Sequence, residues 1–190
     1  MKGAATKLNN PSSPKKEPKR SLFREIREWT AAIVIAVAVS MLIRNYAFAQ
    51  TEVHNVSMQK TLVEGQRLVE DKLSYRFSNP ERGDIVIIKG PESELRLVKR
   101  VIGLPGDNLD MKNGHVYING RLSEETYTKG ETFPEGLKLP FTVPEGTVFV
   151  MGDNRENSQD SRELGPIRFS SLEGKVIFRL WPPNRIGPVR

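Results

Sequence analysis

One uncharged apolar run near the start of the chain most limits how this sequence can fold. The run from Trp29 to Ile43 reads W-T-A-A-I-V-I-A-V-A-V-S-M-L-I, fifteen residues without a charged side chain. As an α-helix it would be about 22 Å long, shorter than the roughly 30 Å apolar core of a bilayer. Extension to residues 29–49 closes the gap, with Arg44 reaching the lipid–water interface and Trp29 and Tyr46 near the two boundaries. We therefore expect one membrane-spanning helix there.

The positive charge of the chain is concentrated before this run. The formal net charge is +6, and residues 1–28 alone hold eight lysines and arginines against three acidic residues. The remaining residues are close to neutral, so a nucleic-acid partner is not expected. A basic tail beside an apolar segment favours contact with the anionic head groups of membrane lipids. Residues 1–20 lack an apolar period and are expected to be disordered.

A cleavable signal peptide is a second interpretation of the same segment. A basic start, an apolar core and Ala47-Phe48-Ala49 before Gln50 fit that pattern as well. The mature chain would then be an exported β-domain binding module. An uncleaved anchor would instead keep the N-terminus in the cytoplasm, because the lysines and arginines precede the span. This window alone favours neither.

The residues after the run predict a mostly β fold, in one extracytoplasmic domain over 50–190. Together with a cytoplasmic tail over 1–28 and an anchor over 29–49, this gives three parts. Expected strands are Gln66–Glu70, Asp84–Lys89, Leu95–Ile102, Val116–Ile118, Thr147–Met151 and Lys175–Leu180.

Turn signals separate several of these strands. Asn113-Gly114 and Asn119-Gly120 are typical tight-turn pairs. Leu104-Pro105-Gly106-Asp107 fits a type II turn, with proline second and glycine third. The polar stretch 123–144 is expected to be a surface excursion.

Metal and disulfide chemistry have little support in this sequence. The chain has no cysteine, and its two histidines are His54 and His115. Disulfides and thiolate metal sites are therefore excluded, and a histidine-based metal site is not expected. No metal or organic cofactor is expected.

Lys99 stands out within the expected strand 95–102. Alternation along a strand puts Leu95, Leu97, Lys99 and Val101 on one face. Lysines at such positions usually pack their stems and extend the amine into water. Alternatively, the aliphatic face desolvates the amine and lowers its pKa from about 10.4 towards neutrality, which would make Lys99 a possible general base.

A nucleophile is sought in the segment that follows the apolar run. It reads V-H-N-V-S-M-Q-K-T-L from Val53 to Leu62 and contains Ser57. A serine hydroxyl needs an adjacent base to attack an amide. His54 is the alternative base, but residues three apart on an extended chain usually point in different directions.

An eleven-residue polar loop follows the strand-like segment 147–151. Residues Gly152 to Arg162 read G-D-N-R-E-N-S-Q-D-S-R. A loop of this composition is often only a solvated turn, but it can also satisfy its own hydrogen bonds around a site.

Three segments resemble the sequence boxes of type I signal peptidases, membrane-bound serine endopeptidases that remove signal peptides from exported proteins. They are Ser57-Met58 with Thr61-Leu62, the run K-R-V-I-G-L-P-G-D from Lys99, and the loop 152–162. The resemblance covers nearly the whole chain after the tail and favours an uncleaved anchor. It implies that Ser57 is the nucleophile and Lys99 the general base, and that exported preproteins are the substrates.

The resemblance also implies supporting roles. Ser158 would hydrogen-bond the lysine amine, and Asp160, Arg162 and Arg100 would form an ionic network. Asp153 and Arg155 would brace the loop between them.

An oxyanion site and substrate pockets are implied as well. The backbone N–H of Ser57 would donate to the oxyanion. Asn55 stands where the family often has serine or glycine, and its amide can donate there too. Lys60 replaces the family's usual proline. Cleavage is expected after small residues at the first and third positions before the bond, with pocket walls from Val53, Met58, Leu62 and Val98.

A self-cleaving Ser/Lys protease of the repressor type is a further alternative. It shares the paired serine and lysine. The apolar span and the lack of a recognisable DNA-binding helix pair argue against it.

Overall fold

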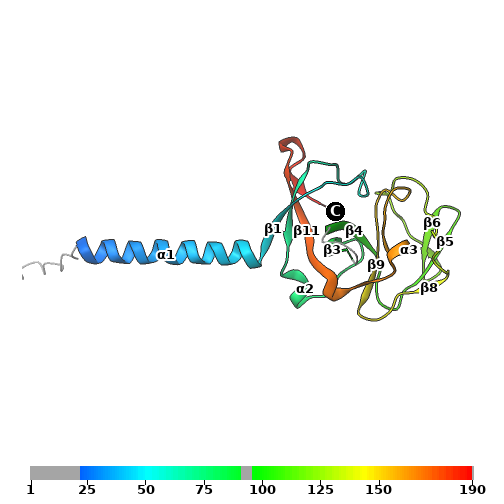
Figure 1. Ribbon diagram of the computed structural model, residues 1–190, viewed down its shortest axis with the longest axis horizontal. Helices are drawn as coiled ribbons and strands as arrows, with labels where there is room; N and C mark the ends of the chain where they lie inside the picture. Colours follow the sequence, from blue (N-terminus) through cyan, green and yellow to red (C-terminus); the bar gives the residue numbers. More distant parts are fainter. Residues whose placement is uncertain (1–21, 91–95, 190) are drawn as a thin grey trace, which may run out of the picture. The chain divides into compact units, whose positions relative to one another are not determined.

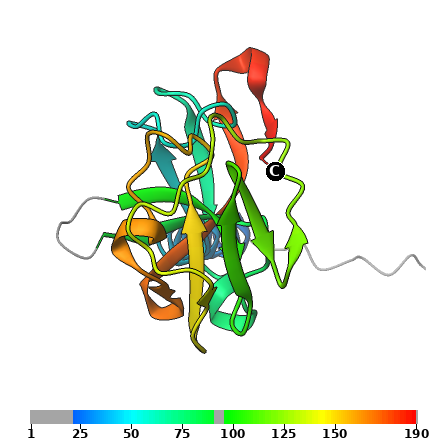
Figure 2. The same ribbon diagram turned by 90° about the vertical axis from the view of Figure 1, so that its right-hand side faces the viewer.

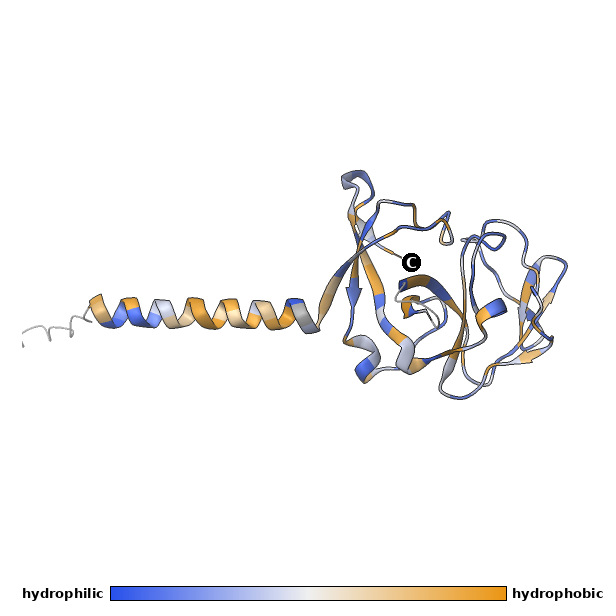
Figure 3. Ribbon diagram, in the orientation of Figure 1, coloured by the Kyte–Doolittle hydropathy of each residue, from blue (hydrophilic) through white to orange (hydrophobic). Residues whose placement is uncertain are grey.

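The structure is a computed structural model that describes residues 22–90 and 96–189. Its first element is the helix α1, Leu22–Tyr46. Residues Leu22–Arg44 are long and apolar enough to cross a membrane, with a mean hydropathy of 1.8, and none of that window is buried in the protein. Figure 3 shows the middle of α1 as predominantly hydrophobic. The exposed apolar surface suits a lipid environment, because water would not favour it. The predicted disorder of residues 1–20 concerns residues outside those described.

The helix does not coincide with the expected anchor over 29–49 at either end. The helix begins seven residues earlier, at Leu22, and ends at Tyr46. The last two residues of the expected span, Phe48 and Ala49, lie in strand β1, Phe48–Glu52. They pair with Asp71 and Glu70 of the next strand, so their backbone groups are bonded in a sheet and not in the helix.

The larger sheet of the β-rich domain contains eight strands, all paired antiparallel. Its order is β1-β2-β11-β3-β4-β9-β10, and β12 pairs with β11. The bounds are β2 Arg67–Asp71, β3 Ile85–Lys89, β4 Arg96–Gly103, β9 Thr147–Met151, β10 Ile167–Arg168, β11 Leu172–Trp181 and β12 Gly187–Pro188. Figure 1 shows the long strand β11 running through this sheet.

A second, four-stranded sheet has the order β7-β6-β5-β8. The bounds are β5 Asn108–Lys112, β6 His115–Ile118, β7 Arg121–Leu122 and β8 Phe141–Thr142. Figure 2 views the β domain with this sheet towards the reader. Both predicted Asn-Gly turns are confirmed: each asparagine has φ 52° and each glycine φ 77°. Positive φ at both central residues is what a type I′ turn requires. The type II turn is confirmed too, with φ +82° at Gly106 and the Asp107 N–H donating to the Leu104 carbonyl.

Short helical segments complete the domain. They are α2 Ser74–Phe77, α3 Ser161–Leu164, η1 Phe169–Ser171 and η2 Pro183–Arg185.

The six predicted strands are all present, with ends shifted by up to three residues, and Leu95 lies outside the described residues. The strands not predicted are β1 and β5 and four two-residue strands, of which β8 lies inside the predicted excursion 123–144.

Strand β4 carries different chemistry on its two faces. Leu97 and Val101 pack in one apolar cluster with Val86, and Val98 packs against a second cluster on the other side. Lys99 lies opposite Val86 in the β3–β4 register, so it shares the face of Leu97 and Val101, as alternation predicts.

Gly103 ends β4 at a tightly packed point. A Cβ there would lie 2.9 Å from Leu109 Cδ1, 2.9 Å from Val143 Cγ2 and 3.0 Å from Phe149 Cβ. A register shift between β4 and β9 falls between Val101 and Gly103. This position has room for glycine only.

Candidate active site

Ser57 and Lys99 meet although they are far apart in sequence. Strand β4 presents Lys99, and the loop after β1 presents Ser57. The Nζ of Lys99 donates to the Oγ of Ser57 at 2.8 Å, and both residues are buried. With the amine neutral, the same short contact lets the Ser57 hydroxyl donate to Nζ. No hydrogen bond between His54 and Ser57 is present among the described residues, and His54 is exposed.

The environment of Lys99 favours the neutral amine. The residue is 2% exposed, and burial lowers its pKa from 10.5 to about 8. The negative charge of Asp160 acts in the opposite direction, and the positive charge of Arg162 lowers the pKa further. Desolvation outweighs the nearby carboxylates here because no acidic side chain pairs directly with Nζ in the described structure.

The loop that contains Ser57 is held by Asn154, a residue that the sequence reasoning did not single out. The N–H of Asn154 donates to the Ser57 carbonyl at 2.9 Å, and its Nδ2 donates to the Val56 carbonyl at 3.2 Å. Asn154 itself is 4% exposed. The N–H of Ser57 has no acceptor among the described residues, so it is free to serve an incoming oxygen. The paired carbonyls fix the direction of that N–H.

Asp160 and Arg162 form a buried two-point ion pair. Nε and Nη2 of Arg162 each lie 2.9 Å from a carboxylate oxygen of Asp160, and the Gly152 N–H donates to the same carboxylate at 2.9 Å. Burial alone would raise the pKa of Asp160, but the hydrogen bonds and charge of Arg162 hold it below its ordinary value. Arg162 also contacts Glu135 at 2.8 Å.

Arg100 does not join that network, contrary to the expectation. Its Nε and Nη2 donate to Asp153 at 2.8 and 2.7 Å, and its guanidinium lies 3.9 Å from the ring centre of Tyr127. Thr61 donates to the same carboxylate. The reason is strand alternation: Arg100 follows Lys99 on β4 and therefore points away from the lysine's face.

Arg155 braces the polar loop against the segment before β8. Its Nη1 lies 2.8 Å from Glu125 and 2.6 Å from Thr132 Oγ1, and its Nε donates to the Gly152 carbonyl at 3.1 Å. The backbone of Lys129 bridges to this loop on both sides of Asn154.

Ser158 does not make the expected hydrogen bond to Lys99. Its Oγ is buried and has no partner with good hydrogen-bond geometry in the described structure, but it lies close enough to Asp160 to help lower the pKa of that carboxyl. It is packed against Gly152, where an added Cβ would lie 2.2 Å from Ser158 Oγ and 2.6 Å from the Ser57 carbonyl. The hydroxyl packs beside Gly152, as the Ser57 carbonyl does, and the predicted role of Ser158 towards the amine stays a prediction.

Comparison with known proteins identifies the family of this chain. A family model described as signal peptidase, peptidase S26, matches residues 26–181. Signal peptidase I P of Bacillus subtilis subsp. natto is 42% identical, with 86% of this chain and 95% of that protein covered. Signal peptidase I of Bacillus licheniformis is 44% identical, with 88% and 93% covered. The chain belongs to the signal peptidase S26 family.

A solved structure of a signal peptidase I from Enterococcus faecalis V583 is also similar in sequence. It is 34% identical, with a TM-score of 0.45, and the match covers 52% of this chain and 97% of that one.

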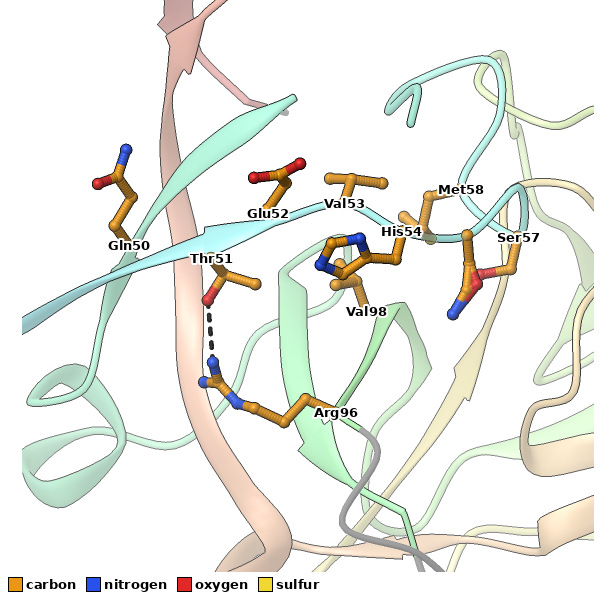
Figure 4. Close-up of a pocket in the computed structure, with 10 residues that line it drawn as sticks. Gln50, Thr51, Glu52, Val53, His54, Ser57, Met58, Arg96 and Val98 are labelled. Atoms are coloured by element: carbon orange, nitrogen blue, oxygen red, sulfur yellow. Dashed lines mark hydrogen bonds between the residues drawn. The ribbon is translucent and has the colours of Figure 1, made fainter. Parts of the chain in front are cut away.

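The signal peptidase chain has a pocket of about 380 Å³ next to Ser57 (Figure 4). Three of the four predicted wall residues line it: Val53, Met58 and Val98. The fourth, Leu62, does not, because it is fully buried in the core cluster below. Asn55 lines the pocket and is exposed.

The sequence reasoning gave no role to three further residues at this site. Thr51 and Arg96 line the far end of the same pocket, and Thr61 supports Asp153. Threonines and a surface arginine carry no distinguishing local pattern. The pairing of β1 and β2 and the length of β4 bring Thr51 and Arg96 to the site, and the fold of the loop after β1 brings Thr61 there.

Proposed function

We propose that this signal peptidase cleaves signal peptides from exported preproteins with Ser57 as the nucleophile and Lys99 as the general base. The observation that carries the proposal is the 2.8 Å contact between Nζ and Oγ in a buried setting. An amine whose pKa is about 8 is partly neutral near pH 7, so it can take the hydroxyl proton.

The reaction proceeds by acyl transfer. Neutral Lys99 accepts the Ser57 hydroxyl proton as Oγ bonds to the scissile carbonyl carbon. The oxyanion that forms accepts a hydrogen bond from the Ser57 N–H. The Lys99 ammonium then protonates the leaving amine as the C–N bond breaks. Water attacks the ester with Lys99 again as base, which releases the signal peptide and restores Ser57. Asn55 lines the pocket, and its side-chain amide is the proposed second donor to the oxyanion.

Two unpaired strand edges are available to bind a substrate in an extended conformation. Strand β1 is the terminal strand of its sheet. The half of β4 from Arg96 to Lys99 pairs only with β3 in the described residues, because pairing with β9 begins at Arg100. A substrate strand can add here, with alternate side chains entering the pocket between Val53, Met58 and Val98. This shallow apolar end suits small residues at the first and third positions before the bond.

The enzyme is membrane-anchored, and its orientation is part of the proposal. The basic residues before α1 favour an N-terminus in the cytoplasm, with contact to anionic lipids, and a catalytic domain outside. Residues 1–28, 29–49 and 50–190 are the proposed tail, anchor and catalytic regions; the helix itself runs from Leu22 to Tyr46, so it begins within the proposed tail and ends before the proposed anchor does.

Cleavage of a preprotein by purified full-length enzyme tests this function. The wild type should release a mature protein whose first residue follows a small–any–small sequence, and Lys99→Ala should release none. Full activity in a folded Lys99→Ala variant would contradict the proposed base.

A further inference from the structure

The pocket beside Ser57 has two chemically different ends. Figure 4 shows Ser57 and Met58 at one end, with Val98 between, and Thr51 and Arg96 at the other. The end near Ser57 is apolar. The far end presents a guanidinium and a hydroxyl to the same groove, so a single extended substrate would pass both surfaces.

The guanidinium of Arg96 is fixed from three sides. Nη2 donates to Glu70 at 2.5 Å, Nη1 donates to Thr51 Oγ1 at 3.0 Å, and Nε donates to Glu173. The Glu70 side chain is fully buried and the side chain of Arg96 is 34% exposed. Three of the five N–H groups are used in these bonds, which leaves two for another acceptor in the described structure. A guanidinium held by these three hydrogen bonds keeps a fixed position at the pocket.

Strand geometry decides which substrate residue meets Arg96. Arg96 and Val98 both face the pocket and are two residues apart on β4, a separation of about 6.7 Å. An extended substrate advances by the same length every two residues. With the first and third residues before the scissile bond at the apolar end, the fifth residue lies at Arg96. The fourth points to the opposite side.

We infer that Arg96 is a specificity-determining residue that selects an uncharged, hydrogen-bonding side chain at the fifth position before the scissile bond. This inference rests on the proposed function. A leucine there would strip water from the guanidinium and its carboxylates and offer no hydrogen bond in return. Asparagine has nearly the same size and accepts from the unused N–H groups. Arg96 thereby limits how close the apolar segment of a signal peptide lies to the cleavage site.

Charge explains why the favoured side chain is neutral. Arg96 is bonded to both Glu70 and Glu173, so the three groups together carry one net negative charge. A carboxylate on the substrate would be repelled by this surplus.

Two pairs of preproteins that differ only by Asn or Leu test the inference with full-length enzyme. One pair varies the fifth residue before the bond, and the matched pair varies the fourth. The wild type should cleave the Asn form at the fifth position with a kcat/KM about tenfold higher than the Leu form. The ratio at the fourth position should be near one.

The key variant is Arg96→Met combined with Glu70→Gln, which removes the cation without leaving a buried carboxylate unpaired. The Asn-to-Leu ratio at the fifth position should fall towards one, while Arg121→Met, an exposed arginine on β7, keeps the wild-type ratio. Thr51→Val, which replaces only one hydroxyl, should lower the Asn-to-Leu ratio part of the way. It provides the test if the double variant does not fold.

Two results would overturn the inference: a wild-type ratio near one at the fifth position, or an unchanged ratio in a folded double variant or in Thr51→Val. If the wild type cleaved neither the Asn preprotein nor the Leu preprotein, this would contradict the proposed function itself, and the inference with it.

Discussion

Asn154 holds Ser57 through the main chain. The N–H of Asn154 donates to the Ser57 carbonyl at 2.9 Å, and the side-chain amide of the same residue donates to the preceding carbonyl, that of Val56. A residue of the polar loop thus fixes the peptide groups on both sides of the Ser57 Cα, and the first of these groups carries the Ser57 N–H. Its contribution is separable, because substitution changes the side-chain bond and leaves the backbone bond possible.

Asn154→Asp should impair catalysis in a pH-dependent way. The carboxylate repels the Val56 carbonyl and adds negative charge close to the Ser57–Lys99 contact, which favours the ammonium form of Lys99. We expect kcat to fall about tenfold and the rising limb of the pH profile to move upward. The control is Asn157→Asp, which adds the same charge at an exposed position of the loop. Equal profiles for the two variants would contradict a positioning role for Asn154.

The two central residues should behave as one unit. Ser57→Ala and Lys99→Ala should each reduce preprotein cleavage by several orders of magnitude, and the double variant should be no worse than either. Lys99→Arg should fail too, because a guanidinium does not deprotonate near neutral pH. Single-turnover cleavage assays measure these effects, with His54→Ala as the control that retains activity. Equal damage from His54→Ala in a folded enzyme would favour the histidine as base.

The pH dependence should follow the buried amine. Neutral Lys99 is the active form, so activity should be low in acid and rise through about pH 8, where burial places the pKa. Leu97 shares the strand face of Lys99, and Leu97→Gln should admit water and shift the rising limb to higher pH. Leu97→Met keeps the face apolar and should leave the limb unchanged. A limb that is fixed in a folded Leu97→Gln enzyme would mean that this face does not set the pKa.

Gly152 should tolerate no side chain. A Cβ would lie 2.2 Å from Ser158 Oγ and 2.6 Å from the Ser57 carbonyl, so Gly152→Ala must displace one or both. We expect a lower Tm and a kcat/KM reduced by about a hundredfold. Adding Ser158→Ala removes only the Oγ and leaves Ser158 Cβ 2.5 Å from the new methyl group, so it should restore little of the Tm or of the activity. Wild-type activity in Gly152→Ala would contradict the close packing.

The orientation can be tested on intact cells from which the wall has been removed. Protease added outside should digest the region after α1 and spare an epitope placed in the tail, because basic residues precede the span. Permeabilised cells provide the control in which both regions are digested. Protection of the catalytic region in intact cells would reverse the proposed orientation.

Local patterns predicted much of the fold. The Asn-Gly pairs and the Pro-Gly turn have chemistry that only certain dihedral angles satisfy, so they were identified correctly. Strand β1 was missed because its first residues continue an apolar run. Its conformation depends on pairing with β2, whose partner residues lie 15 to 23 positions later, and no local sequence preference predicts that pairing.

The site was predictable only in part for a similar reason. Alternation places Lys99 on an aliphatic face, and that much is local. The pairing of Arg100 with Asp153, the burial of Leu62 and the bracing by Asn154 all depend on how distant loops meet. Residue types alone do not specify such long-range contacts.

The packing of Gly103 has a consequence for two neighbouring basic residues upstream. A slip of β4 by one residue would bring Ile102 or Leu104 to a point where even one methyl group is in contact at 2.9 Å, so the strand has a single allowed register. That register turns residue 99 towards the aliphatic side and residue 100 towards Asp153. Of two adjacent basic residues, one is buried beside the Ser57 hydroxyl and the other is paired with a carboxylate, and the missing side chain of Gly103 determines which is which.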